Sequence, residues 1–209
     1  EIYQGLLAET RAPVIPLATA ALSDRRAGCL LGLATGDALG TTLEFSRPGS
    51  FEPMTDMVGG GPFRLEAGQW TDDTSMALCL AASLIECGFD LRDQIERYVR
   101  WWKQGYFSST GSCFDIGNTV SSALRDFMRT GEPVSGSADP YSAGNGSIMR
   151  LAPVPLYFQD ADDCVHFSGE SSRTTHQAPA AIDACRYLGG ILCGLLNGAS
   201  KDEVLAPMY

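Results

Sequence analysis

The sequence has few basic residues, few histidines and no paired cysteine motif. Its 15 lysines and arginines stand against 25 aspartates and glutamates, which gives a net charge of −10. Because sequence-independent nucleic-acid binding depends on basic patches, this balance argues against a nucleic-acid partner. The seven cysteines form no Cys-x-x-Cys pair, so we expect reduced thiols in a cytoplasmic protein, without a zinc site or a disulfide framework.

Long apolar runs and alternating strand patterns are lacking as well. We find neither a signal peptide nor an apolar run of membrane length, so we expect no membrane partner. Apolar residues recur instead at helical spacing, and 44% of the 209 residues are hydrophobic, enough to bury one sizeable core. The sequence therefore predicts an all-α domain, with helices over residues 23–39, 72–85, 90–104, 115–129 and 178–196.

An acidic motif stands at the start of the second predicted helix. The segment 68–74 (GQWTDDT) places two neighbouring carboxylates between two threonine hydroxyls. One interpretation is structural: Thr71 caps the helix, and the aspartates favour its positive end by a few tenths to about 1 kcal/mol each. The other is that Thr71, Asp72 and Asp73 bind Mg²⁺ or Mn²⁺, which accept carboxylate, hydroxyl and water oxygens. These residues alone leave both interpretations open.

Further motifs follow one another along the chain. They are 36–40 (GDALG) followed by Glu44, 59–63 (GGGPF), 68–74 (GQWTDDT), 114–119 (FDIGNT), 144–150 (GNGSIMR) and 175–176 (TH). In this order they resemble the ADP-ribosylglycohydrolase family, metal-dependent hydrolases that include the dinitrogenase-reductase-activating glycohydrolases. The resemblance extends over about residues 23–198. It implies a compact, multi-helix bundle of mostly orthogonal helices.

The resemblance implies catalytic roles for two carboxylates outside the acidic motif. Glu44 corresponds to a residue on a mobile segment that covers the substrate, and Asp115 to a carboxylate directed at the scissile bond. Taken alone, Glu44 would be a solvated surface group and Asp115 an N-cap. Asp37, which follows Gly36 near the end of the first helix, is instead predicted to be a structural acceptor.

A glycine-containing loop is the second expected ligand-binding element. Glycines let the backbone approach a diphosphate closely, and the N–H groups of the following turn face its oxygens. Taken alone, Gly-Asn-Gly is also an ordinary tight turn. The resemblance implies that this loop holds the phosphates and distal ribose of ADP-ribose and that a histidine lines the same cleft. The expected substrate-binding residues are Gly144, Asn145, Gly146, Ser147 and His176.

The two ends of the chain differ from the rest. Residues 1–22 contain Pro13 and Pro16, which break helical continuity, so we expect an N-terminal arm before a domain over residues 23–209. Residues 200–203 form a capping box that opens a new helix. Family members carry a second Asp-x-Asp-Thr/Ser motif further downstream, which these residues lack. Either the protein holds at most half of such a metal site, or a C-terminal fragment or partner polypeptide completes a two-ion site; in the second case we expect that polypeptide to cover the 178–196 helix.

The expected activity is metal-dependent hydrolysis of the glycosidic bond between ADP-ribose and a protein side chain. Arginine is the favoured residue because the motifs are closer to the bacterial arginine-directed members than to the others. The expected partners are thus an ADP-ribosylated protein or ADP-ribose itself. The alternative is a binding protein on the same fold, immunity-type or crystallin-like, with reduced catalysis. In that case residues 1–22 would contact an ADP-ribosyltransferase. A weaker idea is a phosphate-ester hydrolase.

Overall fold

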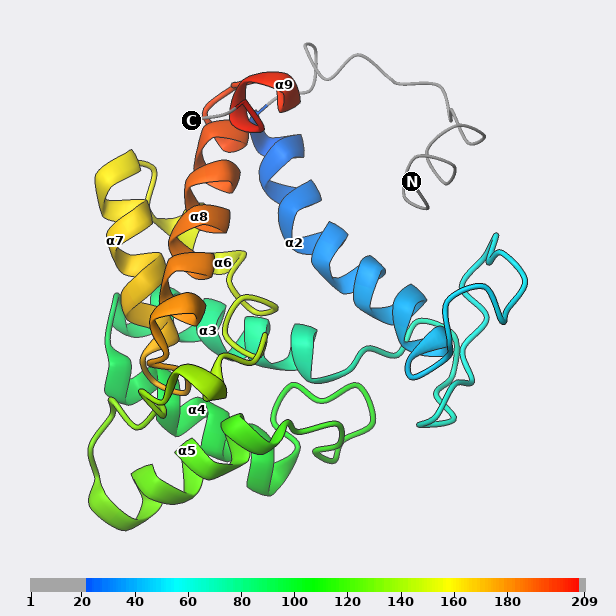
Figure 1. The fold of residues 1–209 in the computed structure, drawn as a ribbon, viewed down its shortest axis with the longest axis horizontal. Helices are drawn as coiled ribbons and strands as arrows, with labels where there is room; N and C mark the ends of the chain where they lie inside the picture. The colour runs from blue at the N-terminus through cyan, green and yellow to red at the C-terminus, as the bar shows by residue number, and fades with distance from the viewer. Residues whose placement is uncertain (1–21, 207–209) are drawn as a thin grey trace.

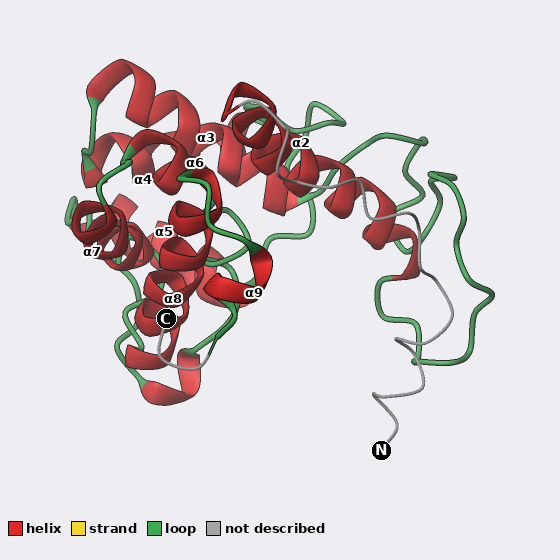
Figure 2. Cartoon of the chain, turned by 90° about the horizontal axis from the view of Figure 1, so that it is seen from above, coloured by secondary structure: helices red, strands yellow, loops and turns green. Residues whose placement is uncertain are grey.

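The computed structural model describes residues 22–206, and every regular element among them is a helix (Figure 1; Figure 2). The helices are α2 (Leu22–Gly40), η2 (Thr41–Leu43), α3 (Asp72–Cys87), α4 (Leu91–Gln104), α5 (Asn118–Thr130), η3 (Pro140–Ser142), α6 (Pro153–Tyr157), α7 (Ala161–Ser172), α8 (Pro179–Leu196) and α9 (Lys201–Val204). The all-α prediction is confirmed, because this part of the chain contains only isolated β-bridges and no strand. The predicted arm, residues 1–22, lies outside the described residues except for Leu22.

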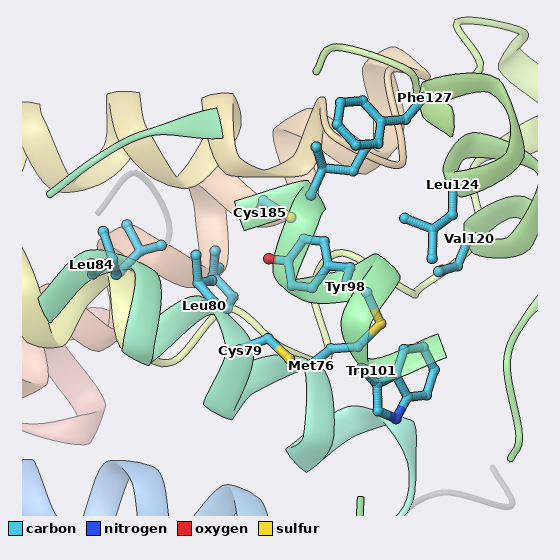
Figure 3. Packing of buried hydrophobic residues seen from close by; sticks show 13 residues of the cluster. Met76, Cys79, Leu80, Leu84, Tyr98, Trp101, Val120, Leu124, Phe127 and Cys185 are labelled. Carbon is cyan, nitrogen blue, oxygen red and sulfur yellow. The ribbon is translucent and has the colours of Figure 1, made fainter. Parts of the chain in front are cut away.

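The core lies where α3, α4 and α5 meet (Figure 3). Tyr98 and Trp101 of α4 share one buried cluster with Met76 of α3 and Leu124 of α5, and Cys185 brings α8 into it. Burying an apolar side chain of this size stabilises the fold by about 1.5–3 kcal/mol. Figure 1 shows α7 and α8 side by side, whereas α2 extends away from the bundle. The cluster therefore anchors the helices from which the loops of the candidate site extend.

The ends of α4 follow the sequence prediction closely. The Asp90 side chain accepts hydrogen bonds from the backbone N–H groups of Arg92 and Asp93. At the other end Gly105 adopts φ 69°, and a Cβ there would collide with the Gly111 carbonyl group. Only glycine fits such a left-handed position in close contact with another backbone segment. The capping box at Ser200 and Glu203 is also confirmed.

Three helical predictions need correction. The helix predicted from Asp115 begins at Asn118, because the backbone of Asp115 is left-handed and cannot continue a helical turn. Helices α6 and α7 were not predicted, although Asp160 caps α7 by accepting from the N–H groups of Asp162 and Asp163. Ile85 continues the apolar helical spacing of Ala77, Leu80, Ala81 and Leu84, which predicts a buried position, but its side chain is 79% exposed.

An apolar groove of about 680 Å³ separates α2 from the C-terminal helices. The side chains that form it come mainly from α2, α8 and α9: Cys29, Leu33, Leu188, Ile191, Leu192, Leu195, Val204 and Leu205. On α2, a Cβ built at Gly28, Gly32 or Gly36 would have no described atom within 4 Å apart from its chain neighbours and the nearby backbone of the helix itself, so no other described element packs closely on these glycines. By length and composition alone α8 could cross a membrane, so the expectation of no such run is wrong. In the fold, α8 packs along α7.

Candidate active site

Asp37, near the end of α2, caps the start of α3. Its carboxylate accepts from the backbone N–H of Thr71 at 3.0 Å and from that of Thr74 at 3.1 Å. It also accepts from the two hydroxyls, at 2.8 Å from Thr71 Oγ1 and 2.7 Å from Thr74 Oγ1. Asp37 is therefore a structural acceptor, as predicted. The interpretation of Thr71 as a side-chain cap is wrong, because its hydroxyl makes no capping bond.

The acidic motif and the glycine loop meet at one cavity of about 400 Å³. Four carboxylates line it: Glu44, Asp72, Asp73 and Asp115. The loop of residues 144–146 and His176 line the same cavity. The remaining lining residues are Phe45 after η2, residues at the start of α5 and just before it (Gly117, Asn118, Thr119 and Val120), and Met149 after the glycine loop. Residues from five separate motifs are thus brought together.

Glu44 is positioned by close packing of the glycine-rich segment against η2. A Cβ at Gly61 would lie 2.6 Å from the Thr41 carbonyl oxygen, so no side chain fits there. The Thr42 hydroxyl donates to the Gly59 carbonyl oxygen at 3.1 Å. These contacts hold the turn that precedes Glu44, whose carboxyl group then reaches the cavity. The triple glycine at 59–61 therefore has a packing role.

The four carboxylates perturb one another. Burial raises the pKa of Asp72 to about 9, with further contributions from the charges of Asp73 and Asp115. Burial, followed by the charge of Glu44, raises the pKa of Asp115 to about 7. The pKa of Glu44 is raised for the same reasons, burial first and then Asp73. No lysine or arginine is among the residues that line the cavity, so the site favours a cation.

The backbone of Asp115 has φ 57°, the left-handed region. A non-glycine residue held there costs of order 1 kcal/mol, and such strain gathers at functional sites. The preceding Phe114 ring lies 5.3 Å from that of Phe63, a contact that holds the turn in place. Asp115 is therefore directed into the cavity from a strained turn.

The glycine loop contacts His176 directly. A Cβ at Gly146 would lie 2.9 Å from both His176 Cε1 and Val120 Cγ2, so glycine is required for the loop to approach this closely. His176 is 1% exposed. Arg150, for which the sequence suggested no role although it ends the same motif, is also buried and donates to the Gly146 carbonyl oxygen at 3.0 Å.

Two of the predicted site residues do not line the cavity. Thr71 is buried, and its hydroxyl bonds to Asp37. Ser147 is buried too: its hydroxyl lies 2.9 Å from that of Ser172, and the Cys185 thiol donates to it at 3.4 Å. Both hydroxyls thus join elements of the fold, and only their neighbours in sequence face the cavity.

The donor chemistry fits a hard divalent cation, with water in a large share of the coordination shell. Among the described residues, no three His, Cys, Asp or Glu side chains converge as a metal-binding group. Mg²⁺ commonly keeps several waters and uses only one or two carboxylates. Burial raises the pKa of both Asp72 and Asp73, and nearby negative charge adds to it, from Asp73 for the first and from Asp37 for the second; a bound cation would relieve this repulsion.

Comparison with known proteins identifies the family. Residues 18–209 match the family model of the ADP-ribosylglycohydrolases. The chain is 50% identical over 186 residues to ADP-ribosylarginine hydrolase Tri1 of Pseudomonas putida. The aligned region covers 88% of this chain and 50% of that protein. The chain is 37% identical over 184 residues to ADP-ribosyl-(dinitrogen reductase) glycohydrolase of Rhodospirillum rubrum, with 84% of this chain and 59% of that protein covered.

A solved structure agrees with these matches. The structure of an ADP-ribosylglycohydrolase-related protein complex superposes with a TM-score of 0.79 at 43% identity, over 88% of this chain and 60% of that chain. This chain spans about half the length of the curated relatives it matches. The ordered motifs, the all-α fold and these matches show that the chain belongs to the ADP-ribosylglycohydrolase family.

Proposed function

We propose that this protein hydrolyses the glycosidic bond between ADP-ribose and a modified arginine side chain. The observation that carries the proposal is the cavity that Asp72, Asp73, Asp115 and Glu44 line together with the glycine loop and His176. Two relatives at 50% and 46% identity are named ADP-ribosylarginine hydrolases. An acidic cavity without a basic side chain also suits a guanidinium leaving group.

Cleavage at the ribose anomeric carbon develops positive charge on the sugar and requires a proton for the leaving group. Asp115 is suited to proton transfer because its pKa of about 7 populates both protonation states near neutral pH. Glu44, whose pKa is also raised, faces the same cavity and can serve as the second acid–base group. The negative charge of the carboxylates stabilises the oxocarbenium-like transition state.

Asp72 and Asp73 would hold Mg²⁺ or Mn²⁺, whereas Thr71, the third predicted ligand, is buried against Asp37 and does not line the cavity. When bound, such an ion orients ribose hydroxyls and lowers the pKa of a coordinated water. A second ion would need carboxylate ligands in addition to Asp72 and Asp73. The glycine loop would bind the diphosphate through backbone N–H groups.

The test is release of free ADP-ribose from an ADP-ribosylated arginine peptide in the presence of Mg²⁺, measured by chromatography. We expect Asp115→Asn and Glu44→Gln each to slow release by about 100-fold or more, since positioned acid–base groups contribute about 10²–10⁴-fold. Glu52→Gln changes an exposed glutamate that does not line the cavity and should leave the rate unchanged. Equal rates for all three variants would overturn the proposal. A peptide that carries ADP-ribose on serine tests the preference for arginine, and we expect slower release from it.

A second candidate is a binding protein on the same fold with reduced catalysis. The observation that favours it is the burial of the Thr71 hydroxyl against Asp37, which leaves only Asp72 and Asp73 of the acidic motif at the cavity. Tight binding of ADP-ribose without release from any peptide would support it. A role for residues 1–22 in contacting an ADP-ribosyltransferase stays a prediction outside the described residues. We also propose a cytoplasmic location, which seven unpaired cysteines favour.

A further inference from the structure

Arg150 is a buried cation without a carboxylate partner among the described residues. It is 1% exposed, and the ion pairs found in the structure involve other residues. Its Nη1 donates to the Gly146 carbonyl oxygen, and its Nη2 donates to Thr174 Oγ1 at 2.9 Å and to Thr175 Oγ1 at 2.8 Å. The guanidinium also lies 4.4 Å from the centroid of the Tyr98 ring. A buried arginine needs such acceptors, so it fixes the segments that supply them.

The two threonine hydroxyls that accept from Arg150 also bond to different groups. Thr174 Oγ1 accepts from Arg150 and donates to the Ser171 carbonyl oxygen at 3.0 Å. Thr175 Oγ1 accepts from the same nitrogen and lies 2.8 Å from His176 Nδ1. No other acceptor for the Thr175 hydroxyl is found among the described residues. Because leaving a buried hydroxyl proton unpaired costs about 1–3 kcal/mol, Thr175 donates to Nδ1.

This assignment fixes the tautomer of the ring. An Nδ1 that accepts a hydrogen bond carries a lone pair, so the neutral ring must carry its proton on Nε2. Burial, and then the positive charge of Arg150, lower the pKa of His176 to about 4, which keeps the ring neutral at physiological pH. The hydrogen-bond geometry and the electrostatics therefore agree.

The Nε2 atom lies at the cavity, beside the glycine loop. A Cβ built at Gly144 would be 3.4 Å from it and one at Gly146 would be 3.3 Å from it, and His176 is among the lining residues. No hydrogen-bond partner of Nε2 is found in the described part of the chain. An N–H donor held by a buried ring thus faces the space where a ligand would lie.

We propose that Arg150 and Thr175 are positioning residues that hold His176 as the Nε2–H tautomer, so that the ring donates a hydrogen bond to an oxygen of the bound ligand. The identity of that ligand, ADP-ribose, rests on the function proposed above. The tautomer itself does not depend on it. A neutral donor fixed in this way binds a ligand oxygen and adds no positive charge to a cavity whose carboxylates favour a cation.

The tautomer can be measured in the ligand-free protein by heteronuclear NMR of histidine-labelled samples. The chain has only two histidines, and His166 is an exposed internal reference. We expect His176 to show the Nε2–H pattern at pH 7 in the wild type. Thr175→Val should mix or reverse the tautomers, and Thr175→Ser should restore them. Thr174→Val is the matched control, since it removes an equally buried Arg150 acceptor that does not touch His176.

Calorimetric titration with ADP-ribose tests the donor role. We expect Thr175→Val to weaken binding about 5- to 20-fold, and Thr175→Ser and Thr174→Val to stay within about 2-fold of the wild type. An Nδ1–H pattern in the wild type, or equal weakening by both valine variants, would overturn the positioning role. If the tautomer is found as expected but ADP-ribose does not bind, the proposed function fails and the donor role toward ADP-ribose fails with it.

Discussion

Asp37→Ala is the substitution for which the structure allows the clearest energetic estimate. The carboxylate accepts from two backbone N–H groups and two hydroxyls, and both Thr71 and Thr74 are at most 3% exposed. Loss of an N-cap costs about 0.5–2 kcal/mol. The orphaned threonine hydroxyls add about 1–3 kcal/mol because water reaches them poorly. We therefore expect the free energy of unfolding to fall by about 3 kcal/mol.

The measurement is urea unfolding followed by circular dichroism, in which the midpoint should shift while the slope stays constant. Asp160→Ala is the matched control. Asp160 caps α7 through two backbone N–H groups of its own helix, and the bonds it makes are exposed, so its loss should cost only about 1 kcal/mol. Equal losses for the two variants would refute the reasoning that Asp37 joins α2 to α3.

Three further predictions concern the cation, pH and the groove. Asp73→Asn should weaken Mg²⁺ binding at least ~10-fold by calorimetry, since one of the few carboxylate ligands becomes neutral; Asp126→Asn, on exposed α5 surface, should not. Folding lowers the pKa of His176 from 6.5 to about 4, so the unfolded state binds a proton first as the pH falls. The free energy of unfolding should therefore be highest above pH 6.5 and decrease by at most about 3 kcal/mol as the pH falls toward 4. His176→Gln should reduce this decrease, which thermal melts at several pH values would measure. If polypeptide absent from this chain covers the groove in the whole protein, Leu192→Asp should lower its melting temperature, whereas Tyr187→Asp, at a 64% exposed position of the same helix, should not.

The sequence predicted most of the helices because their boundaries are set locally. Asp90 and Gly105 terminate α4 through bonds to residues within four positions, so a short stretch of sequence contains the whole signal. Asp115 was misleading for the same reason. Aspartate is a common N-cap residue, but Asp115 lies three positions before the helix begins, and only the tertiary contacts of its turn give it a left-handed backbone.

The candidate site was predictable in its residue types but not in its bonding. Asp37 was identified as an acceptor, yet its donors lie 34 and 37 positions further along the chain, where periodicity gives no information. The orientation of Ser147 depends likewise on Ser172 and Cys185, which approach only in the folded state. The role of Arg150 follows from burial, which no local pattern of charge could reveal.

At Asp115, the residue that would make the fold most stable differs from the residue that the proposed reaction needs. Glycine would adopt φ 57° without strain and asparagine with little, and either would remove one of the four mutually repelling carboxyl groups. A mutant library screened only for survival at high temperature should therefore enrich such replacements at position 115. The selected variants would be more thermostable but would lack the proposed acid–base group. Engineering of this fold for stability therefore has to select for catalytic turnover at the same time.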